Sequence, residues 1–306
     1  MDIGTFCEEV VKCIREVLDE DARIKVHKMY KNNDICLHSI VISYGNQQCV
    51  PNIYMDEYYH KYKMGFMSLG QIACEVIKER HILGHQMIEP LGEMTWENAK
   101  DKVFCRLVNL EMNKKKLENM PYMEYLDLAV TCRLLHSADK TGIASADITY
   151  EEMELFGVTK EELFAQAREN TEKLFPVEFK SLLSTIEAMM GRKFGFEVTD
   201  TGEKMDSEIA GRFEMYVLSN TLGINGAGVI LYPDVLKRIA EQLDTDTLYL
   251  MPSSVHEFMV LKEYRSIEDM KSLVKDANHC AVAGMDLLSD NVYKYDRTTD
   301  TVEIAV

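Results

Sequence analysis

The stretch Leu126–Leu134, with the sequence LDLAVTCRL, alternates apolar and polar side chains along most of its length. A period of two residues is typical of a β-strand that turns one face toward a core. Val103–Leu110 is rich in apolar residues and is predicted to be a neighbouring strand. Together they predict a half-buried sheet in the middle of the chain.

Further pairs of predicted strands, each joined by a short polar turn, lie before and after this segment in the sequence. The predicted pairs are Ile24–Tyr30 with Ile35–Tyr44, Leu248–Met251 with Phe258–Leu261 around the turn Pro252–Ser254, and Val292–Tyr295 with Val302–Val306. Neighbouring strands joined in this way are antiparallel. We therefore expect an α+β fold with mainly antiparallel sheets rather than a doubly wound α/β sheet.

Helix starts are marked by capping boxes, in which a hydroxyl and a Glu or Gln three residues later bond each other's backbone N–H. They are Thr5–Glu8, Ser68–Gln71, Thr149–Glu152 and Thr159–Glu162. Apolar residues at helical spacing follow each box. The same spacing predicts helices over Phe179–Met190, over Leu236–Leu243 with Pro233 as first helical residue, and after Ser266. These elements predict two α+β units, residues 1–145 and 196–306, and a helical connector over residues 146–195.

Composition limits the classes of function. The 306 residues carry 34 Lys and Arg against 51 Asp and Glu, a formal charge of −17. This charge argues against nucleic-acid binding, which depends on cations contacting phosphates. The eight cysteines form no CxxC pair, so we expect reduced thiols. There is no basic leader followed by an apolar segment, and no apolar run near the roughly 18 residues of a membrane span. We expect a soluble cytoplasmic protein with no membrane partner.

Three stretches of the C-terminal half resemble an uncharacterised clostridial family, domain of unknown function 5688. They are Gly223–Gly228, Leu248–Glu257 and Ser289–Arg297. Tyr125–Arg133 and Val158–Pro176 are more remotely similar to the YtpQ-like proteins of Bacillus. The resemblance implies a bacterial, cytoplasmic protein. It implies no catalytic residue, because neither family supplies an activity to transfer.

Two clusters contain residue types that catalysis uses. Ser253, Ser254, His256 and Glu257 combine hydroxyls, an imidazole and a carboxylate, the components of a nucleophilic site. No GxSxG turn surrounds the serines, and a hairpin turn followed by an edge strand explains them equally well.

The second cluster, His81, His85 and Glu89, would share one helix face as metal ligands can. The residue after the first histidine is not the Glu of a metalloprotease, and a frayed helix end is the alternative explanation.

Other motifs favour structure over chemistry. Gly223, Gly226 and Gly228 have the wrong order for a dinucleotide fingerprint and predict a turn that needs positive φ or a close backbone approach. No cofactor is expected. The segment Tyr54–Phe66 is crowded with tyrosines, and many of the 19 methionines lie in the N-terminal half. Both are explained by core packing, or by a protein-contact surface.

The sequence therefore leaves three hypotheses open. The first is a non-enzymatic protein-interaction or regulatory factor, for example in a mobile element or host-defence system. The second is a hydrolase or metal-assisted enzyme that uses one of the two clusters. The third is a small-ligand binder with its site in a cleft between the two units.

Overall fold

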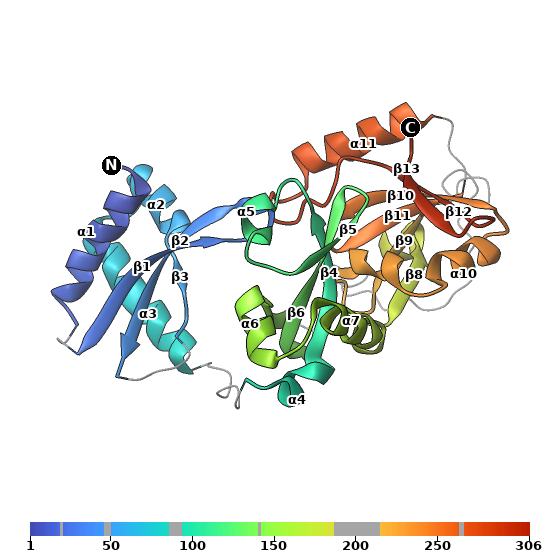
Figure 1. Cartoon of the computed structure of the whole chain (residues 1–306). Coiled ribbons are helices and arrows are strands. Elements are labelled where there is room, and N and C mark those ends of the chain that lie inside the picture. Colours follow the sequence, from blue (N-terminus) through green and yellow to red (C-terminus); the bar gives the residue numbers. More distant parts are fainter. Residues whose placement is uncertain (19–20, 46–49, 86–93, 140–141, 187–214, 263–265) are drawn as a thin grey trace, which may run out of the picture. The chain divides into compact units, whose positions relative to one another are not determined.

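The computed structural model describes residues 1–18, 21–45, 50–85, 94–139, 142–186, 215–262 and 266–306. Helices and antiparallel sheets make up the fold (Figure 1), which confirms the α+β class. No helix within these ranges combines the length and apolar character needed to cross a bilayer.

The chain divides into two compact units, Met1–Met94 and Thr95–Val306. The sequence placed its boundaries at residues 145 and 195 instead. The difference arises because residues 95–145 form side-chain bonds with much later segments. Asn109 donates to the carbonyl of Leu288 at 2.9 Å, and Ser289 donates to the Asp127 carboxylate at 2.6 Å.

The first unit is a three-stranded antiparallel sheet with helices packed on one of its faces. Its elements are α1 (Ile3–Arg15), β1 (Ala22–Tyr30), η1 (Asn32–Asp34), β2 (Cys36–Tyr44), β3 (Ile53–Tyr54), α2 (Asp56–Lys63) and α3 (Leu69–His85). The predicted hairpin is present, with Ile24 opposite Ile42. Both isoleucines join Phe6 of α1 and Ile72 of α3 in one buried cluster.

The second unit contains two antiparallel sheets. The first has the order β4-β6-β5, and β7 also pairs with β6. It is built from α4 (Trp96–Ala99), η2 (Lys100–Lys102), β4 (Val103–Asn109), α5 (Lys114–Leu117), β5 (Tyr122–Tyr125), β6 (Leu128–Asp139) and β7 (Gly142–Asp147). The predicted pairing of Val103–Leu110 with Leu126–Leu134 is confirmed, because Cys105 lies opposite Cys132.

The second sheet of this unit has six strands in the order β13-β12-β10-β11-β9-β8. Its strands and the helices around them are α6 (Tyr150–Phe156), α7 (Lys160–Leu174), β8 (Val177–Ser181), β9 (Met215–Asn220), η3 (Gly226–Leu231), α10 (Val235–Gln242), β10 (Thr247–Ser254), β11 (Glu257–Leu261), α11 (Ile267–Cys280), β12 (Tyr293–Asp296) and β13 (Thr301–Ile304). Strand β8 comes from the segment predicted as connector, so that segment contributes to this sheet.

Three of the four capping boxes are confirmed. Ser68, Thr149 and Thr159 each exchange hydrogen bonds with the Gln or Glu three residues later. At the fourth, the helix begins earlier: Asp2 caps α1 and accepts from the Thr5 N–H at 3.1 Å. Asp2 is a better N-cap than Thr5, because a carboxylate at a helix N-terminus also interacts favourably with the helix dipole.

Two other local predictions need correction. The helix predicted over Phe179–Met190 begins later: Phe179 lies in strand β8 opposite Leu218 of β9, residues 182–186 are helical, and residues 187–190 lie outside the described residues. Pro233 precedes α10 rather than starting it, because Asp234 takes a left-handed conformation at the N-cap position. The helix predicted to open at Ser266 is present as α11, and the Ser266 hydroxyl accepts from the Asp269 N–H at 3.2 Å.

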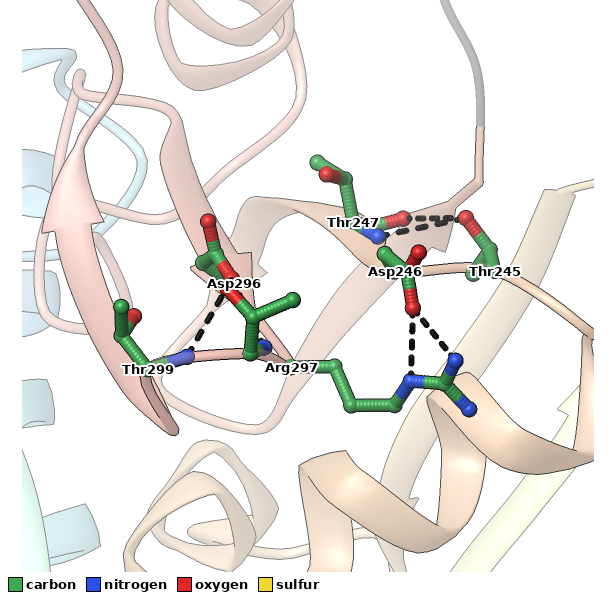
Figure 2. Close-up of polar contacts among 7 residues, drawn as sticks. Thr245, Asp246, Thr247, Asp296, Arg297 and Thr299 are labelled. Carbon is green, nitrogen blue, oxygen red and sulfur yellow. Dashed lines mark hydrogen bonds and ion pairs between the residues drawn. The ribbon is translucent and has the colours of Figure 1, made fainter.

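Side-chain contacts hold the edge hairpin β12–β13 to the turn before β10. Figure 2 shows the Arg297 guanidinium directed at the Asp246 carboxylate, to which Nε donates at 2.9 Å. The Arg297 N–H also donates to the Asp246 carbonyl at 2.9 Å. Within the hairpin turn, Asp296 accepts from the Thr298 N–H at 2.8 Å. These bonds fix the position of an edge strand that has only one neighbour in the sheet.

Candidate functional site

The segment Ser253–Glu257 lies where β10 turns into β11. Strand β10 continues through Pro252 to Ser254, which pairs with Glu257, so the turn consists of Val255 and His256. The turn predicted at Pro252–Ser254 therefore lies immediately before the observed one. Strand β11 lies between β10 and β9 and is not an edge strand.

The structure brings Ser254 close to the backbone of His256 and not to its ring. The Ser254 Oγ accepts from the His256 N–H at 3.0 Å, which closes the turn. Among the described contacts, neither Ser253 nor Glu257 bonds the imidazole. The serine cluster is a turn whose hydroxyl satisfies a backbone donor, a common use of serine at such positions.

The imidazole of His256 is held by two groups that the sequence did not indicate. Its Nδ1 accepts from the Asn225 N–H at 3.1 Å, so the ring proton of the neutral form is on Nε2. Nε2 faces the Asp286 Oδ1 at 3.4 Å. Both ring nitrogens are occupied, and 34% of the side chain remains exposed. Asn225 and Asp286 lie about thirty residues from His256 in either direction, so no local motif could have identified them.

Gly226 packs directly beneath this turn. A Cβ at this position would lie 2.1 Å from Ser219 Oγ, 2.5 Å from the His256 carbonyl oxygen and 2.8 Å from the Asn220 nitrogen. Gly223 has a φ of +65°. The prediction is confirmed for Gly223 through its positive φ and for Gly226 through the close approach, whereas a Cβ at Gly228 would make only an ordinary contact at 3.8 Å.

A cavity of about 610 Å³ lies between α7, β4 and η3. Its wall includes the side chains of Cys105, Arg168, Thr171, Leu231 and Tyr232. Its volume is within the range of small-molecule sites, roughly 300–1,000 Å³. The sequence offered no signal for this cavity, because its walls come from three segments that are distant along the chain.

Cys105 gives the cavity wall a perturbed thiol. A hydrogen bond from the Cys132 thiol lowers the pKa of Cys105, against the opposing effect of burial. Thr171 is close as well, since its Oγ1 accepts from the Cys105 N–H at 2.8 Å. Cys105 and Cys132 are buried, whereas Cys74 is exposed. No disulfide joins the seven cysteines that the structure describes.

The histidines of the predicted metal cluster lie at the end of α3. His81 is exposed on this helix and His85 is its last residue, while Glu89 is outside the described residues. Within the described part of the chain, no three His, Cys, Asp or Glu side chains are grouped as a metal site would require. The metal site therefore stays a prediction.

The tyrosine-rich segment packs partly on the core of the first unit. The rings of Tyr59 and Tyr62 lie 5.2 and 5.3 Å from that of Phe6. Phe66, at the end of the segment, is 72% exposed. The segment is therefore packed on the core in part and exposed in part, and its contact with another protein stays a prediction.

Comparison with known proteins places the chain in a family. The model of a family of unknown function (DUF5688) matches residues 3–297. The chain belongs to this family. The DUF5688 match covers both compact units, so both are parts of one family architecture. No curated protein and no solved structure matches the chain. The clostridial source and the similarity to YtpQ-like proteins stay predictions.

Proposed function

We propose that this DUF5688 protein is a binding protein that takes a small organic anion in the cavity between α7, β4 and η3. The observation that supports this is the cavity itself, whose wall is partly apolar and also carries two cations, Arg168 and Lys173, and two carboxylates, Glu169 and Glu172. Leu231, Tyr232 and Pro233 form the apolar part. Such a combination is the usual form of a ligand site, in which apolar contact provides affinity and a few polar groups provide orientation.

Arg168 is the cation that would orient the ligand. Its Nη2 contacts the Met123 sulfur at 3.8 Å, and no carboxylate pairs with it among the described residues. The other cation of the cavity, Lys173, is paired with Glu169 at 2.6 Å. An anionic group on the ligand would therefore find Arg168 available, while the apolar body would contact Leu231 and Tyr232.

A dye that combines fused apolar rings with one sulfonate, anilinonaphthalene sulfonate, tests this proposal. Gly228→Leu would fill the cavity, since a Cβ at Gly228 meets only the Cys105 carbonyl oxygen at 3.8 Å. We expect one dye per chain in the wild type, and at least about tenfold weaker binding in Gly228→Leu, equivalent to roughly 1.4 kcal/mol. The measurement is a fluorescence titration.

The matched control is Gly70→Leu, which adds the same side chain at an exposed position of α3 with open space around it. This variant should bind the dye like the wild type. Equal affinities for the wild type and Gly228→Leu would overturn the cavity as the site.

A second function, contact with another protein, is favoured by the turn between α2 and α3. Phe66 and Met64 are 72% and 58% exposed there. The turn is fixed by backbone bonds from Met64 to His60 and from Phe66 to Lys61, at 3.0 and 2.9 Å. A rigid turn that presents large apolar side chains loses little entropy on binding. Lys63 beside it favours a partner with an apolar groove and an acidic rim.

Site-specific photo-cross-linking in the source cells would test this contact. A cross-linkable residue at Phe66 should give one adduct of discrete mass, and Lys63→Glu should reduce its yield severalfold because the acidic rim would repel it. The control position is Leu155, which is 62% exposed on α6. Adducts of equal yield from both positions, or none from position 66, would count against the contact.

A further inference from the structure

Four charged side chains converge on one face of the β4–β6–β7 sheet. Arg106 of β4 lies opposite Thr131 of β6, and Arg133, two residues further along β6, lies opposite Asp147 of β7. Residues opposite each other, or two apart on one strand, share a face of an antiparallel sheet. The register alone therefore places these side chains together.

Helix α5 adds a third cation above the same face. Lys116 Nζ lies 2.7 Å from Asp147 Oδ2, and Arg133 Nη1 contacts the other oxygen of this carboxylate. The neighbouring residue Leu117 packs on Val108 and Ala129 of the sheet. The side chains of Lys116, Arg133 and Asp147 are 15%, 14% and 27% exposed, so water and small solutes still reach the group.

Arg106 is the member of this group that lacks a partner. Its Nε is buried and makes no hydrogen bond. Among the described residues, no carboxylate forms an ion pair with it, because both oxygens of Asp147 are bound by Lys116 and Arg133. Burial, and next the charge of Arg133, lower the pKa of Arg106 to about 10. Leaving a buried charged donor unsatisfied is costly, so this arrangement calls for a compensating anion.

The other carboxylate that acts on Arg106, Asp286, does not pair with it. The charge of Asp286 acts favourably on Arg106, but the contact that Asp286 makes is with His256 Nε2 at 3.4 Å. Around Asp147, the charges of Arg133 and Lys116 outweigh burial and hold the pKa of this carboxyl below its ordinary value. Asp147 therefore stays ionised, and cations still exceed anions at this point of a chain whose net charge is −17.

We propose that Arg106 and Arg133, with Lys116 beside them, bind a phosphate group, either as free phosphate or as the head of a small phosphate monoester. A guanidinium presents parallel N–H donors that match the oxygens of a phosphate. Arg106 would supply such a pair of donors. The Nε and Nη2 of Arg133 already donate to the Oγ and carbonyl oxygen of Ser145 at 3.0 and 2.8 Å, so Arg133 would add the second hydrogen of a terminal nitrogen from the neighbouring strand. The anion would satisfy the donors of Arg106 and would balance the excess of cations.

Thermal unfolding with added sodium phosphate, at ionic strength held constant with sodium chloride, tests the site. Phosphate at ten times its dissociation constant should raise the ratio of folded to unfolded protein about elevenfold in the wild type. Arg106→Gln should bind phosphate at least about tenfold more weakly, the effect of losing one hydrogen bond to a charged group. Glycerol phosphate is the parallel probe, and tighter binding of it than of phosphate would identify a monoester as the ligand.

A second readout separates binding from a structural role. Without phosphate, Arg106→Gln should be as stable as the wild type or more stable, because it removes an unsatisfied buried charge. A structural ion pair would give the opposite result. Arg297→Gln, which removes an exposed arginine paired with Asp246, should keep the full phosphate response.

The proposal fails if phosphate stabilises the wild type and Arg106→Gln equally, or stabilises neither up to about 10 mM, beyond which a site of physiological use is not expected. It is independent of the ligand cavity, because Gly228→Leu should keep the phosphate response while losing the dye.

Discussion

Replacing Gly226 by alanine is expected to destabilise the protein by about 3 kcal/mol or more, at the upper end of overpacking costs. The new methyl group would meet Ser219 Oγ, the His256 carbonyl oxygen and the Asn220 nitrogen, all closer than 3.0 Å. Two of these three atoms belong to the backbone and cannot rotate away. The substitution would also separate the Ser219 hydroxyl from the His256 carbonyl oxygen, which it now bonds at 2.8 Å.

Gly228→Ala is the matched control, because it makes the same change two residues later in η3. Its methyl group would meet one atom, the Cys105 carbonyl oxygen, at an ordinary 3.8 Å. Urea unfolding should therefore show a large drop in the midpoint for Gly226→Ala and little change for Gly228→Ala. Similar midpoints for both variants would contradict the close approach at Gly226.

The second large effect is expected for Asp127→Ala. Its free energy of unfolding should fall by about 3 kcal/mol, because the substitution leaves buried donors without an acceptor. The Asp127 carboxylate accepts from Tyr293 OH at 2.7 Å, Ser289 Oγ at 2.6 Å and Asn291 Nδ2 at 3.0 Å. Tyr293 is fully buried. Its hydroxyl would lose its acceptor in a place that water reaches poorly.

Two companion variants test the cause of this loss. Asp276→Ala removes an exposed carboxylate from α11 and should leave the urea midpoint almost unchanged. Ser289→Ala removes one of the three donors together with its own bond, so its cost should be clearly smaller than that of Asp127→Ala. Equal losses in Asp127→Ala and Ser289→Ala would show that the other two bonds contribute nothing.

Local signals in the sequence were sufficient to predict most of the strand pairs and several helix starts. The apolar period of Leu126–Leu134 and the hairpin around residues 31–34 reflect burial of one sheet face, which each strand expresses in its own residues. Even there the boundary shifted. Leu126 has a φ of +58° and is 39% exposed, so the strand begins at Leu128 and Asp127 turns toward Ser289 and Tyr293.

Contacts between distant segments determine the features that could not be predicted from the sequence. Phe179 has helical spacing with its neighbours, yet pairing with β9 makes it part of a strand, and its ring stacks on Tyr216 at 5.0 Å. Strand preference depends on such neighbours more than helix preference does. The candidate sites follow the same rule: His256 was visible as a residue type, whereas its partners Asn225 and Asp286 are identified only by the fold.

The bond between Asp127 and Tyr293 also sets the order in which parts of the chain can fold during synthesis on the ribosome. The two residues are 166 positions apart, so a growing chain that exposes Asp127 must wait for most of the second unit before this bond can close. The first unit has its own buried cluster within 94 residues and can fold while synthesis continues. Until Tyr293 emerges, the Asp127 carboxylate next to the nascent β4–β6 sheet has only water as its donor in place of the Tyr293 hydroxyl.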